Sequence, residues 1–400
     1  MKTTRRNFLI TTTLAAAGAA AASEVGAQNP SLAVPPAGPM PQRVLGRTGL
    51  KVSEIGFGGY PIKDPEVVEY ALERGINYFD TANCYPADSE IALGKALAKG
   101  KNRERAVLAT KWCPHHIGKP PTKANLIAQL DDSLKKLQTD HVDVLFVHQV
   151  GPSDGQTKGT DYARLSNPDL WEAWETVKKA GKARFLGASG HEGNLMEVMN
   201  FVVLSGKFDV ILCRYNFMNF PAQPDLIKLC REKNVGFVAM KTLAGAKGGA
   251  AEGFRDKFTS YKQAALKWVL SNPDVSNLVI SISDRNQVDE YVAAAGAAIT
   301  KKDVVLLDEY RNRFSREICR YASDCEPACP NGVRIADILR SSMYYHEYRE
   351  EKHGITEYAS IPAAHNASGC AECAAPCQKV CPHELPLREL LSTAHQRLTV

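Results

Sequence analysis

Residues 79–85 read FDTANCY, residues 109–112 read ATKW, and residues 146–149 read FVHQ. Each stretch lies at the end of an apolar run that is typical of a buried strand. They place Asp80, Tyr85, Lys111 and His148 at or just beyond the ends of three consecutive predicted strands. Parallel α/β folds carry their chemistry where the strands end, so we expect these four polar groups to face one another.

The chain around these residues alternates short apolar strands with amphipathic helices from about Arg43 to Thr300. Eight strands with seven intervening helices predict a TIM (β/α)8 barrel, which is an α/β fold. A doubly wound sheet is the rival, but no strand leads into the GxGxxG turn of a Rossmann fold. The predicted strands cover residues 54–59, 78–82, 106–112, 143–149, 184–190, 209–216, 236–242 and 278–283. The clearest predicted helices cover residues 65–75, 123–137, 169–181, 224–234 and 261–272.

The two ends of the chain are expected to lie outside this barrel. Residues 1–27 resemble a twin-arginine signal peptide, with Arg5 and Arg6 before an Ala-rich stretch and a small-residue cleavage site. An ordinary amphipathic helix is the alternative. Residues 28–42 predict a Pro-rich linker, residues 43–300 the barrel, and residues 301–400 a small, mainly helical, cysteine-rich domain.

These ends lead to an expectation about location. The signal predicts export to the periplasm, or otherwise out of the cytoplasm, by the twin-arginine route. Its apolar run is shorter than the roughly 20 residues that span a bilayer, so we expect no integral membrane segment in the mature chain. The net charge of +5 over 400 residues is too weak and too dispersed to favour nucleic acid as a partner.

The four residues at the strand ends are suited to one kind of chemistry. A carbonyl group that accepts hydride develops negative charge on its oxygen and needs a proton there. Tyr85 can donate it, and a nearby ammonium from Lys111 is expected to lower the phenol pKa from about 10. Asp80 would hold the lysine, and His148 would orient and polarise the carbonyl oxygen. The alternative for each residue taken alone is a turn cap, a solvated charge or a core histidine.

The chain resembles the aldo/keto reductase family. The resemblance begins at VLGRTGLKVSEIGFGGYP (44–61), continues through GINYFDTANCYPADSEIALGKAL (75–97) and VDVLFVHQ (142–149), and extends to the eighth strand. It implies a TIM barrel, an NADP(H) or NAD(H) cofactor across the barrel mouth, and reduction of a small aldehyde or ketone. It also implies Tyr85 as general acid, Lys111 and Asp80 as its tuning pair, and His148 as the orienting group.

The family's cofactor positions match this sequence only in part. The resemblance implies contacts from Ser189, Tyr215, Asn216, Arg285 and Gln287. The positions that differ from the family pattern are Gly190 for an asparagine, Leu212 for a glutamine, and Met240 for an aromatic residue. Arg285 could pair with a 2′-phosphate, or it is a solvated loop arginine.

The tail carries two runs of cysteine. The first contains Cys319, Cys325 and Cys329-Pro330, and the second contains Cys370, Cys373, Cys377 and Cys381-Pro382. The second run resembles the bacterial ferredoxin signature with one extra residue, so four thiolates in twelve residues predict a 4Fe–4S cluster. Zinc and disulfides are the alternatives. The first run has only three cysteines, so a second complete cluster is in doubt. An arrangement in which Cys329 joins the second run stays open.

Two classes of function therefore remain. The first is an NAD(P)-dependent oxidoreductase of the aldo/keto reductase type, with an iron–sulfur tail. The second is an electron-transfer or binding protein that uses the barrel as a scaffold and has an electron-transfer partner. A glycoside-modifying barrel would need an inward-facing pair of carboxylates, and this sequence shows none. Small apolar packing is the expected role of the barrel cysteines, and one of them, Cys84, adjoins Tyr85.

Overall fold

The computed structural model describes residues 39–86, 89–113, 121–148, 150, 165–190, 195–218, 222–245, 261–322 and 324–399. The predicted signal peptide and most of the predicted linker lie outside the described residues. Residues 32–400 form one compact unit. Among the helices within the described ranges, none has the length and apolar character that crossing a membrane would require.

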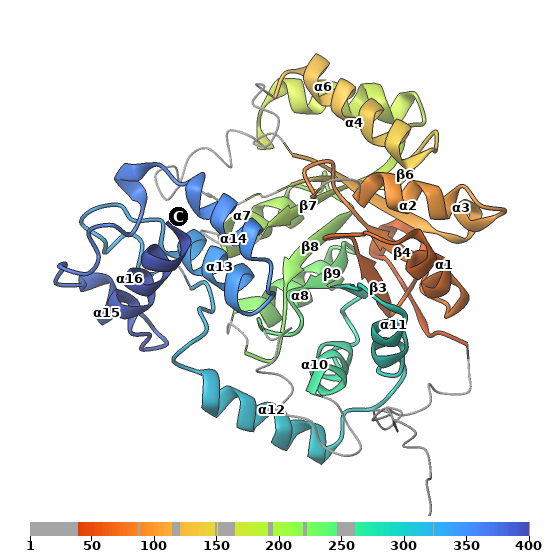
Figure 1. Cartoon of the computed structure of the whole chain (residues 1–400). Coiled ribbons are helices and arrows are strands. Elements are labelled where there is room, and N and C mark those ends of the chain that lie inside the picture. The colour runs from red at the N-terminus through yellow and green to blue at the C-terminus, as the bar shows by residue number, and fades with distance from the viewer. Residues whose placement is uncertain are drawn as a thin grey trace, which may run out of the picture. The chain divides into compact units, whose positions relative to one another are not determined.

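Eight parallel strands close into a barrel, which confirms the predicted TIM-barrel fold (Figure 1). The ring runs in the order β10-β3-β4-β5-β6-β7-β8-β9, and pairing of Leu278 in β10 with Ile55 in β3 closes it. The doubly wound alternative is therefore wrong. Each strand overlaps one of the predicted stretches: β3 (Ile55–Gly58), β4 (Tyr78–Asp80), β5 (Val107–Trp112), β6 (Val142–Val147), β7 (Ala183–Gly190), β8 (Val210–Arg214), β9 (Gly236–Met240) and β10 (Asn277–Ser281).

Amphipathic helices surround the strands, as Figure 1 shows. Side chains cap the starts of two of them: Asp64 accepts a hydrogen bond from the N–H of Glu66, and Thr122 accepts one from the N–H of Asn125. These side chains satisfy first-turn N–H groups that have no partner inside the helix. The helices are α1 (Pro65–Glu73), α2 (Ser89–Leu97), α3 (Asn102–Arg105), α4 (Lys123–Leu137), α6 (Pro168–Lys179), α7 (Leu195–Leu204), α8 (Ala222–Glu232), α10 (Tyr261–Leu270) and α11 (Arg285–Val292).

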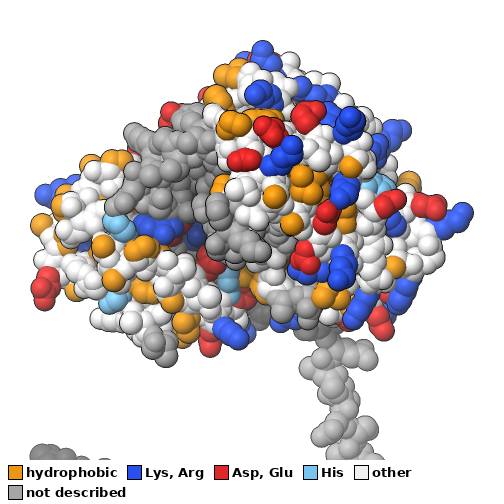
Figure 2. Space-filling view, turned by 90° about the horizontal axis from the view of Figure 1, so that it is seen from above, with side chains coloured by type: hydrophobic (Ala, Val, Ile, Leu, Met, Phe, Trp, Pro, Cys, Tyr) orange, Lys and Arg blue, Asp and Glu red, His pale blue; other side chains and the backbone are white. Residues whose placement is uncertain are grey.

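Alternating side chains along each strand fill two separate cores. Val144 and Phe146 of β6 point into the barrel interior, where they pack with Tyr78 and Leu212. Leu145, from the same strand, joins the larger core between the strands and the helices. Exposed ion pairs contribute little beside these cores. On the face seen in Figure 2, Lys and Arg side chains are interspersed with Asp and Glu side chains.

A short antiparallel hairpin, which the sequence did not predict, packs at the N-terminal end of the barrel. It pairs β1 (Gln42–Val44) with β2 (Lys51–Ser53). The hairpin contributes Leu45 to the interior core. Gly46 in the connecting turn has a φ of +50°, and a Cβ there would lie 2.3 Å from the backbone nitrogen of Gly236. Only glycine allows the turn to approach β9 so closely.

The tail is helical, as expected, and it contacts the barrel. Helix α12 contributes Leu306, Leu307 and Tyr310 to the barrel's outer core. A separate apolar cluster begins at Cys325 and includes residues of all the later helices. The predicted boundary between residues 300 and 301 stays a prediction. The tail helices are α12 (Lys301–Phe314), α13 (Ile335–His346), α14 (Glu351–Ala359), α15 (Pro376–Lys379) and α16 (Leu387–Leu398).

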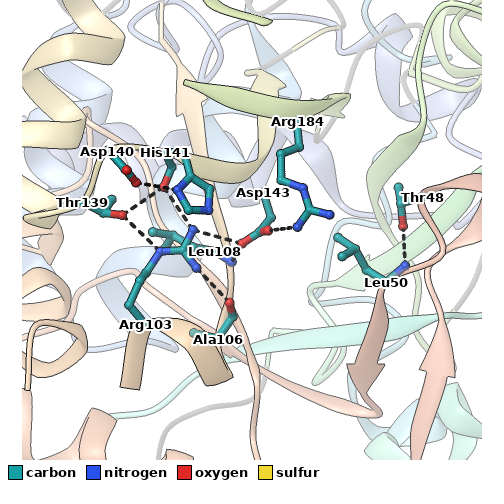
Figure 3. Close-up of polar contacts among 10 residues, drawn as sticks. All are labelled: Thr48, Leu50, Arg103, Ala106, Leu108, Thr139, Asp140, His141, Asp143 and Arg184. Carbon is teal, nitrogen blue, oxygen red and sulfur yellow. Dashed lines mark hydrogen bonds and ion pairs between the residues drawn. The ribbon is translucent and has the colours of Figure 1, made fainter. Parts of the chain in front are cut away.

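A buried carboxylate links three strands near the hairpin end of the barrel (Figure 3). Asp143, at the start of β6, is 3% exposed. Its Oδ1 accepts a hydrogen bond from Arg184 Nη1 of β7 at 2.7 Å. Its Oδ2 accepts from Arg103 Nη2 at 3.2 Å and from the Leu108 N–H of β5 at 2.9 Å. One side chain thus fixes the relative positions of β5, β6 and β7.

We expect Asp143→Ala to lower the free energy of unfolding by about 2–3 kcal/mol, because buried donors lose their acceptor. The half-exposed Arg184 places this figure below the range for fully buried pairs. Chemical denaturation followed by tryptophan fluorescence measures the change. Asp131→Ala, which removes an exposed ion pair with Lys182, is the matched control and should change little. Equal effects of the two substitutions on the free energy of unfolding would contradict the role of Asp143 in fixing the three strands.

Candidate active site

A pocket of about 140 Å³ lies at the carboxyl ends of the barrel strands. Its walls come from strands β3, β4, β8, β9 and β10, from the segments that follow β4 and β6, and from tail helices α13 and α14. Tyr85 lines this pocket together with Asp80 and His148. The barrel therefore brings predicted catalytic residues from separate strands to one cavity, as the fold requires.

Lys111 on β5 and Asp80 on β4 form a buried ion pair. Lys111 Nζ donates hydrogen bonds to Asp80 Oδ2 and to the carbonyl oxygen of Thr81, each at 2.6 Å. The two charged side chains are at most 4% exposed. Burial raises the pKa of Asp80 and lowers the pKa of Lys111, while each partner opposes the effect on the other. Each charge is tolerated in this interior because the other is present.

Tyr85 packs against this ion pair and against His148. Its ring centroid lies 4.6 Å from Lys111 Nζ and 6.0 Å from the centroid of the His148 ring. The ring of Tyr60 meets it edge-on, with the centroids 5.1 Å apart. All four residues predicted as catalytic are thus assembled in one place, while their individual roles stay predictions.

One electrostatic expectation is wrong. The sequence predicted that Lys111 lowers the pKa of Tyr85, whereas this pKa is raised well above its usual value. Burial is the largest cause, and the carboxylate of Asp80 is the next. Burial and the Asp80 carboxylate together outweigh the attraction of the Lys111 ammonium for a phenolate. Tyr85 is therefore a neutral phenol that keeps its proton at neutral pH.

The roof of the pocket consists of aromatic and cationic residues that the sequence analysis missed. Lys241, directly after β9, donates a hydrogen bond from Nζ to the hydroxyl of Tyr344 at 3.1 Å and lies over the Tyr344 ring. Tyr344 stacks on Tyr60 with centroids 6.3 Å apart, and His353 of α14 lies 4.9 Å from Tyr60. No local pattern in the sequence connects Lys241 with the aromatic run from Tyr344 to Tyr348.

Two barrel cysteines also lie at this site, and small apolar packing does not describe them. Cys84 and Cys113 form a disulfide, with their Cα atoms 6.1 Å apart. His148 Nδ1 lies 3.0 Å from Cys113 Sγ and 3.4 Å from Cys84 Sγ. The disulfide therefore joins the residue before Tyr85 to a residue just after β5, next to the predicted orienting histidine.

The predicted cofactor contact Ser189 lies at the end of β7. It is 1% exposed, and its Oγ has no hydrogen-bond partner among the described residues. The neighbouring Gly190 cannot be replaced by a larger residue in this backbone, because a Cβ would lie 2.0 Å from the carbonyl oxygen of Val150. The missing asparagine is thus explained by a close approach of two chain segments. Leu212 and Met240, the other differing positions, line the pocket.

Tyr215 and Asn216, the two predicted cofactor residues after β8, contact neighbouring elements of the barrel. Tyr215 packs on Trp268 of α10, with centroids 5.1 Å apart, and its hydroxyl accepts a hydrogen bond from Asn272. Asn216 donates a hydrogen bond from Nδ2 to the carbonyl oxygen of Lys241 at 3.0 Å. The structure does not bring either side chain to the pocket that contains Tyr85.

The predicted phosphate-binding residues lie at the start of α11. Arg285 forms an ion pair with Glu66 at 3.1 Å, and both side chains are more than half exposed. Gln287 accepts a hydrogen bond from the N–H of Ser283 at 3.0 Å. An exposed ion pair of this kind is weak, so the Arg285 guanidinium can exchange Glu66 for a phosphate group. Both residues follow β10, whose Ser281 lines the pocket.

The tail cysteines divide into two neighbouring sets. Burial, which is the largest cause, and the charges of the Cys329, Cys377 and Cys373 thiols raise the pKa of Cys370 to about 11. Each of these four side chains comes from the tail, and Cys329 belongs to the first run.

The second set contains the remaining thiols. Burial, followed by the thiol of Cys319, the carboxylate of Glu326 and the thiol of Cys381, raises the pKa of Cys325. Cys381 comes from the second run. Cys329, the last cysteine of the first run, thus groups with Cys370, Cys373 and Cys377, whereas Cys381, the last of the second run, groups with Cys319 and Cys325. The first set has four thiols and the second has three.

None of the seven tail cysteines is in a disulfide, and six of them, all except Cys373, belong to or pack against one apolar cluster. Backbone N–H groups of Tyr321, Val333 and Ala375 donate to three of the sulfurs. A single zinc ion with bonds of about 2.3 Å holds its sulfurs about 3.8 Å apart. Among the described residues, the tail thiols do not form a group close enough to share one metal ion.

Comparison with known proteins agrees with this geometry. The aldo/keto reductase family model matches residues 55–257, which ends before the cysteine-rich tail. The chain is 30% identical to L-galactose dehydrogenase of Arabidopsis thaliana over 288 residues, covering 63% of this chain and 87% of the relative. It is 27% identical to the uncharacterized oxidoreductase YrpG of Bacillus subtilis (strain 168) over 318 residues, covering 66% and 94%.

Solved structures support the same fold. The aldo-keto reductase AKR11C1 from Bacillus halodurans (holo form) superposes with a TM-score of 0.54 at 23% identity, covering 68% of this chain and 96% of that one. The aldo/keto reductase family model matches half of this sequence, and the curated relatives are matched over most of their own length. This chain therefore belongs to the aldo/keto reductase family and is an oxidoreductase.

Proposed function

We propose that this oxidoreductase reduces an aldehyde or ketone, or oxidises the corresponding alcohol, by hydride transfer with a reduced nicotinamide cofactor and with Tyr85 as the general acid. The family uses NADP(H), which supports this choice. One observation carries the proposal: a protonated, half-buried phenol lines a pocket beside His148 and next to the Lys111–Asp80 ion pair.

The side chains divide the work of protonation. A carbonyl oxygen in the pocket lies near the Tyr85 hydroxyl and the His148 ring, which both line it. As negative charge develops on that oxygen, the Tyr85 hydroxyl donates its proton, because an alkoxide is a stronger base than a phenolate. Lys111 then stabilises the phenolate that forms, while Asp80 keeps the ammonium in position.

The proposed cofactor supplies the hydride, which no side chain can provide. Ser189, whose buried hydroxyl has no partner within the described residues, does not line the pocket and would hold the cofactor's amide group only once the pocket widens. Arg285 is suited to its phosphates. The cavity of about 140 Å³ is smaller than the roughly 300–1,000 Å³ of most ligand pockets, so a whole dinucleotide requires α13 and α14 to move outward.

Replacement Tyr85→Phe should lower kcat for reduction of para-nitrobenzaldehyde by at least about a hundredfold, because the acid is lost while the ring remains. Quenching of protein fluorescence by NADPH should be unchanged. The raised pKa of Tyr85 keeps the phenol protonated, so the rate of the wild-type protein should hold from neutral to weakly alkaline pH.

Tyr345→Phe is the matched control, because Tyr345 packs in the tail cluster outside the pocket. It should leave kcat unchanged. Full turnover by Tyr85→Phe, with NADPH still bound, would remove Tyr85 as the acid. No binding of NADPH by the wild-type protein would instead favour the second candidate, an electron-transfer or binding protein that uses the barrel as a scaffold.

We also propose that the tail holds a 4Fe–4S cluster. Cys329, Cys370, Cys373 and Cys377 form the complete four-thiol set that such a cluster takes, and backbone N–H groups already point at sulfurs in this region. The exchange of last cysteines between the two runs is the pattern of two-cluster ferredoxins. Cys319, Cys325 and Cys381 form the set that lacks a fourth thiol.

Anaerobically purified protein should contain at least about four iron atoms and four acid-labile sulfides per chain. Cys329→Ser should lose this iron although it leaves the second cysteine run intact, because the set draws on both runs. Cys213→Ser, on β8, is the control and should retain the iron. Zinc without sulfide, or disulfides among the tail cysteines without metal, would contradict the cluster.

Export by the twin-arginine route is the third part of the proposal, since this route carries folded proteins with their cofactors in place. Substitution of Arg5 and Arg6 by lysine should retain the protein in the cytoplasm, as followed by immunoblotting of cell fractions. Exchange of Lys2 for arginine is the control. A periplasmic protein that survives the double substitution would refute this route.

A further inference from the structure

One cation at the wall of the active-site pocket has no anion to balance it. The Lys, Arg, Asp and Glu side chains that line the pocket are Asp80, Lys241, Arg340 and Glu357. Asp80 forms an ion pair with Lys111, and Arg340 forms one with Glu357 at 3.7 Å. Within the described part of the chain, Lys241 forms no ion pair. The wall therefore carries one positive charge that neither fold nor proposed mechanism uses.

The ammonium of Lys241 lies on the pocket side of the wall. Its Nζ is 4.7 Å from the centroid of the Tyr344 ring and 5.5 Å from that of the Tyr348 ring. Both tyrosines line the active-site pocket, and neither lines the neighbouring cavity of about 30 Å³ that Lys241 also touches. Lys241 directly follows β9, so it belongs to the barrel and would keep its place if α13 and α14 moved outward to admit the cofactor.

Hydrogen-bond donors remain here for one more partner. An ammonium carries three N–H donors, and Lys241 uses one of them, to the hydroxyl of Tyr344 at 3.1 Å. That hydroxyl acts as the acceptor, and no other described residue accepts its own proton. A ligand with two acceptor oxygens can therefore accept from both groups at once.

The charge on Lys241 persists at neutral pH. Burial lowers the pKa of Lys241, but interactions with Tyr344 and Tyr348 outweigh burial, and the pKa is raised above its usual value. The carboxylate of Glu350 also favours the ammonium, although the two groups form no ion pair. A largely buried charge without a counter-ion is unfavourable, so a bound anion would be stabilised beside it.

The other walls indicate what such an anion is attached to. The ring of Tyr60 lies 5.1 Å from the ring of Tyr85 and 6.3 Å from that of Tyr344, so aromatic surface extends from the proposed acid to the partner of Lys241. The cavity of about 140 Å³ admits a small molecule. One ammonium and one hydroxyl match the two oxygens and the single charge of a carboxylate.

We propose that the substrate is a small oxo acid, whose carboxylate binds Lys241 Nζ and the Tyr344 hydroxyl while its carbonyl group lies beside Tyr85. This rests on the proposed function of the pocket. The carbonyl carbon gains the hydride, its oxygen gains the proton of Tyr85, and the reduced nicotinamide becomes oxidised. The carboxylate takes no part in this step; it holds the carbonyl group at the acid, which is how remote binding energy assists a reaction.

Two pairs of substrates test this assignment, each an acid and its neutral methyl ester. The rigid pair is para-formylbenzoate and its ester, and the flexible pair is succinic semialdehyde and its ester. With NADPH and the full-length protein, kcat/KM for the acid should exceed that for the ester at least about tenfold in one pair or both, because a charged hydrogen bond is lost in the ester. Equal values within both pairs would overturn the proposal.

Substitutions then assign the preference to its residues. Lys241→Met removes the charge at similar length and should bring the ratio of acid to ester close to one, mainly through a higher KM for the acid. Lys241→Arg should keep the preference, and Tyr344→Phe should lower it in part. Lys228→Met, at an exposed position of α8, is the matched control and should keep the wild-type ratio. Lys241→Met with weaker binding of NADPH and an unchanged ratio would place a cofactor phosphate at Lys241 and overturn the proposal.

A binding measurement does not depend on catalysis. In titration calorimetry without cofactor, para-(hydroxymethyl)benzoate should bind the wild-type protein at least about tenfold more tightly than its methyl ester, and Lys241→Met should abolish the difference. If this difference is found and no aldehyde is reduced, the proposed function fails while the carboxylate site stands. If aldehydes are reduced but the acids are preferred neither in turnover nor in binding, the carboxylate site fails and the proposed function stands.

Discussion

The pairing of β10 with β3 is the contact on which the rest of the molecule depends. It joins the last barrel strand to the first and turns an open sheet into a ring. Only in a closed ring do the carboxyl ends of all eight strands converge on one axis. Residues separated by more than a hundred positions, such as Asp80 and Ser281, then line the same pocket.

Inside that ring, charge is balanced at short range. Lys111 and Asp80 pair at 2.6 Å in the interior, and burial, followed by the Asp80 carboxylate, raises the pKa of the Tyr85 phenol beside them. The Lys111 ammonium lies over the Tyr85 ring, so under the proposed function its charge would stabilise the negative charge that develops on Tyr85.

Local sequence patterns were sufficient to predict the barrel and the polar residues at the ends of its strands. The eight strands were found because buried parallel strands are continuous apolar runs, and Asp80, Lys111 and His148 because polar residues ended those runs. Contacts between segments that are distant in the sequence could not be predicted from local patterns. Neither the Cys84–Cys113 disulfide nor the Lys241–Tyr344 hydrogen bond leaves a local signal, because both depend on where separate segments meet. The pKa direction of Tyr85 was missed for the same reason, since burial is a property of the whole fold.

The spacing of the tail cysteines held more information than the motif alone suggested. Ala322 stands three residues after Cys319 and three before Cys325, where a regular ferredoxin run has a cysteine. The first run is therefore a complete signature with one ligand replaced.

Helix α12 gives the tail a second role. Leu306, Leu307 and Tyr310 complete the barrel's outer core, although they lie beyond its last strand. A chain whose tail had not folded would leave this apolar strip of the barrel uncovered, and exposed apolar surface is what chaperones and proteases recognise in unfolded chains. The barrel therefore depends on a helix beyond its last strand to cover part of its outer core.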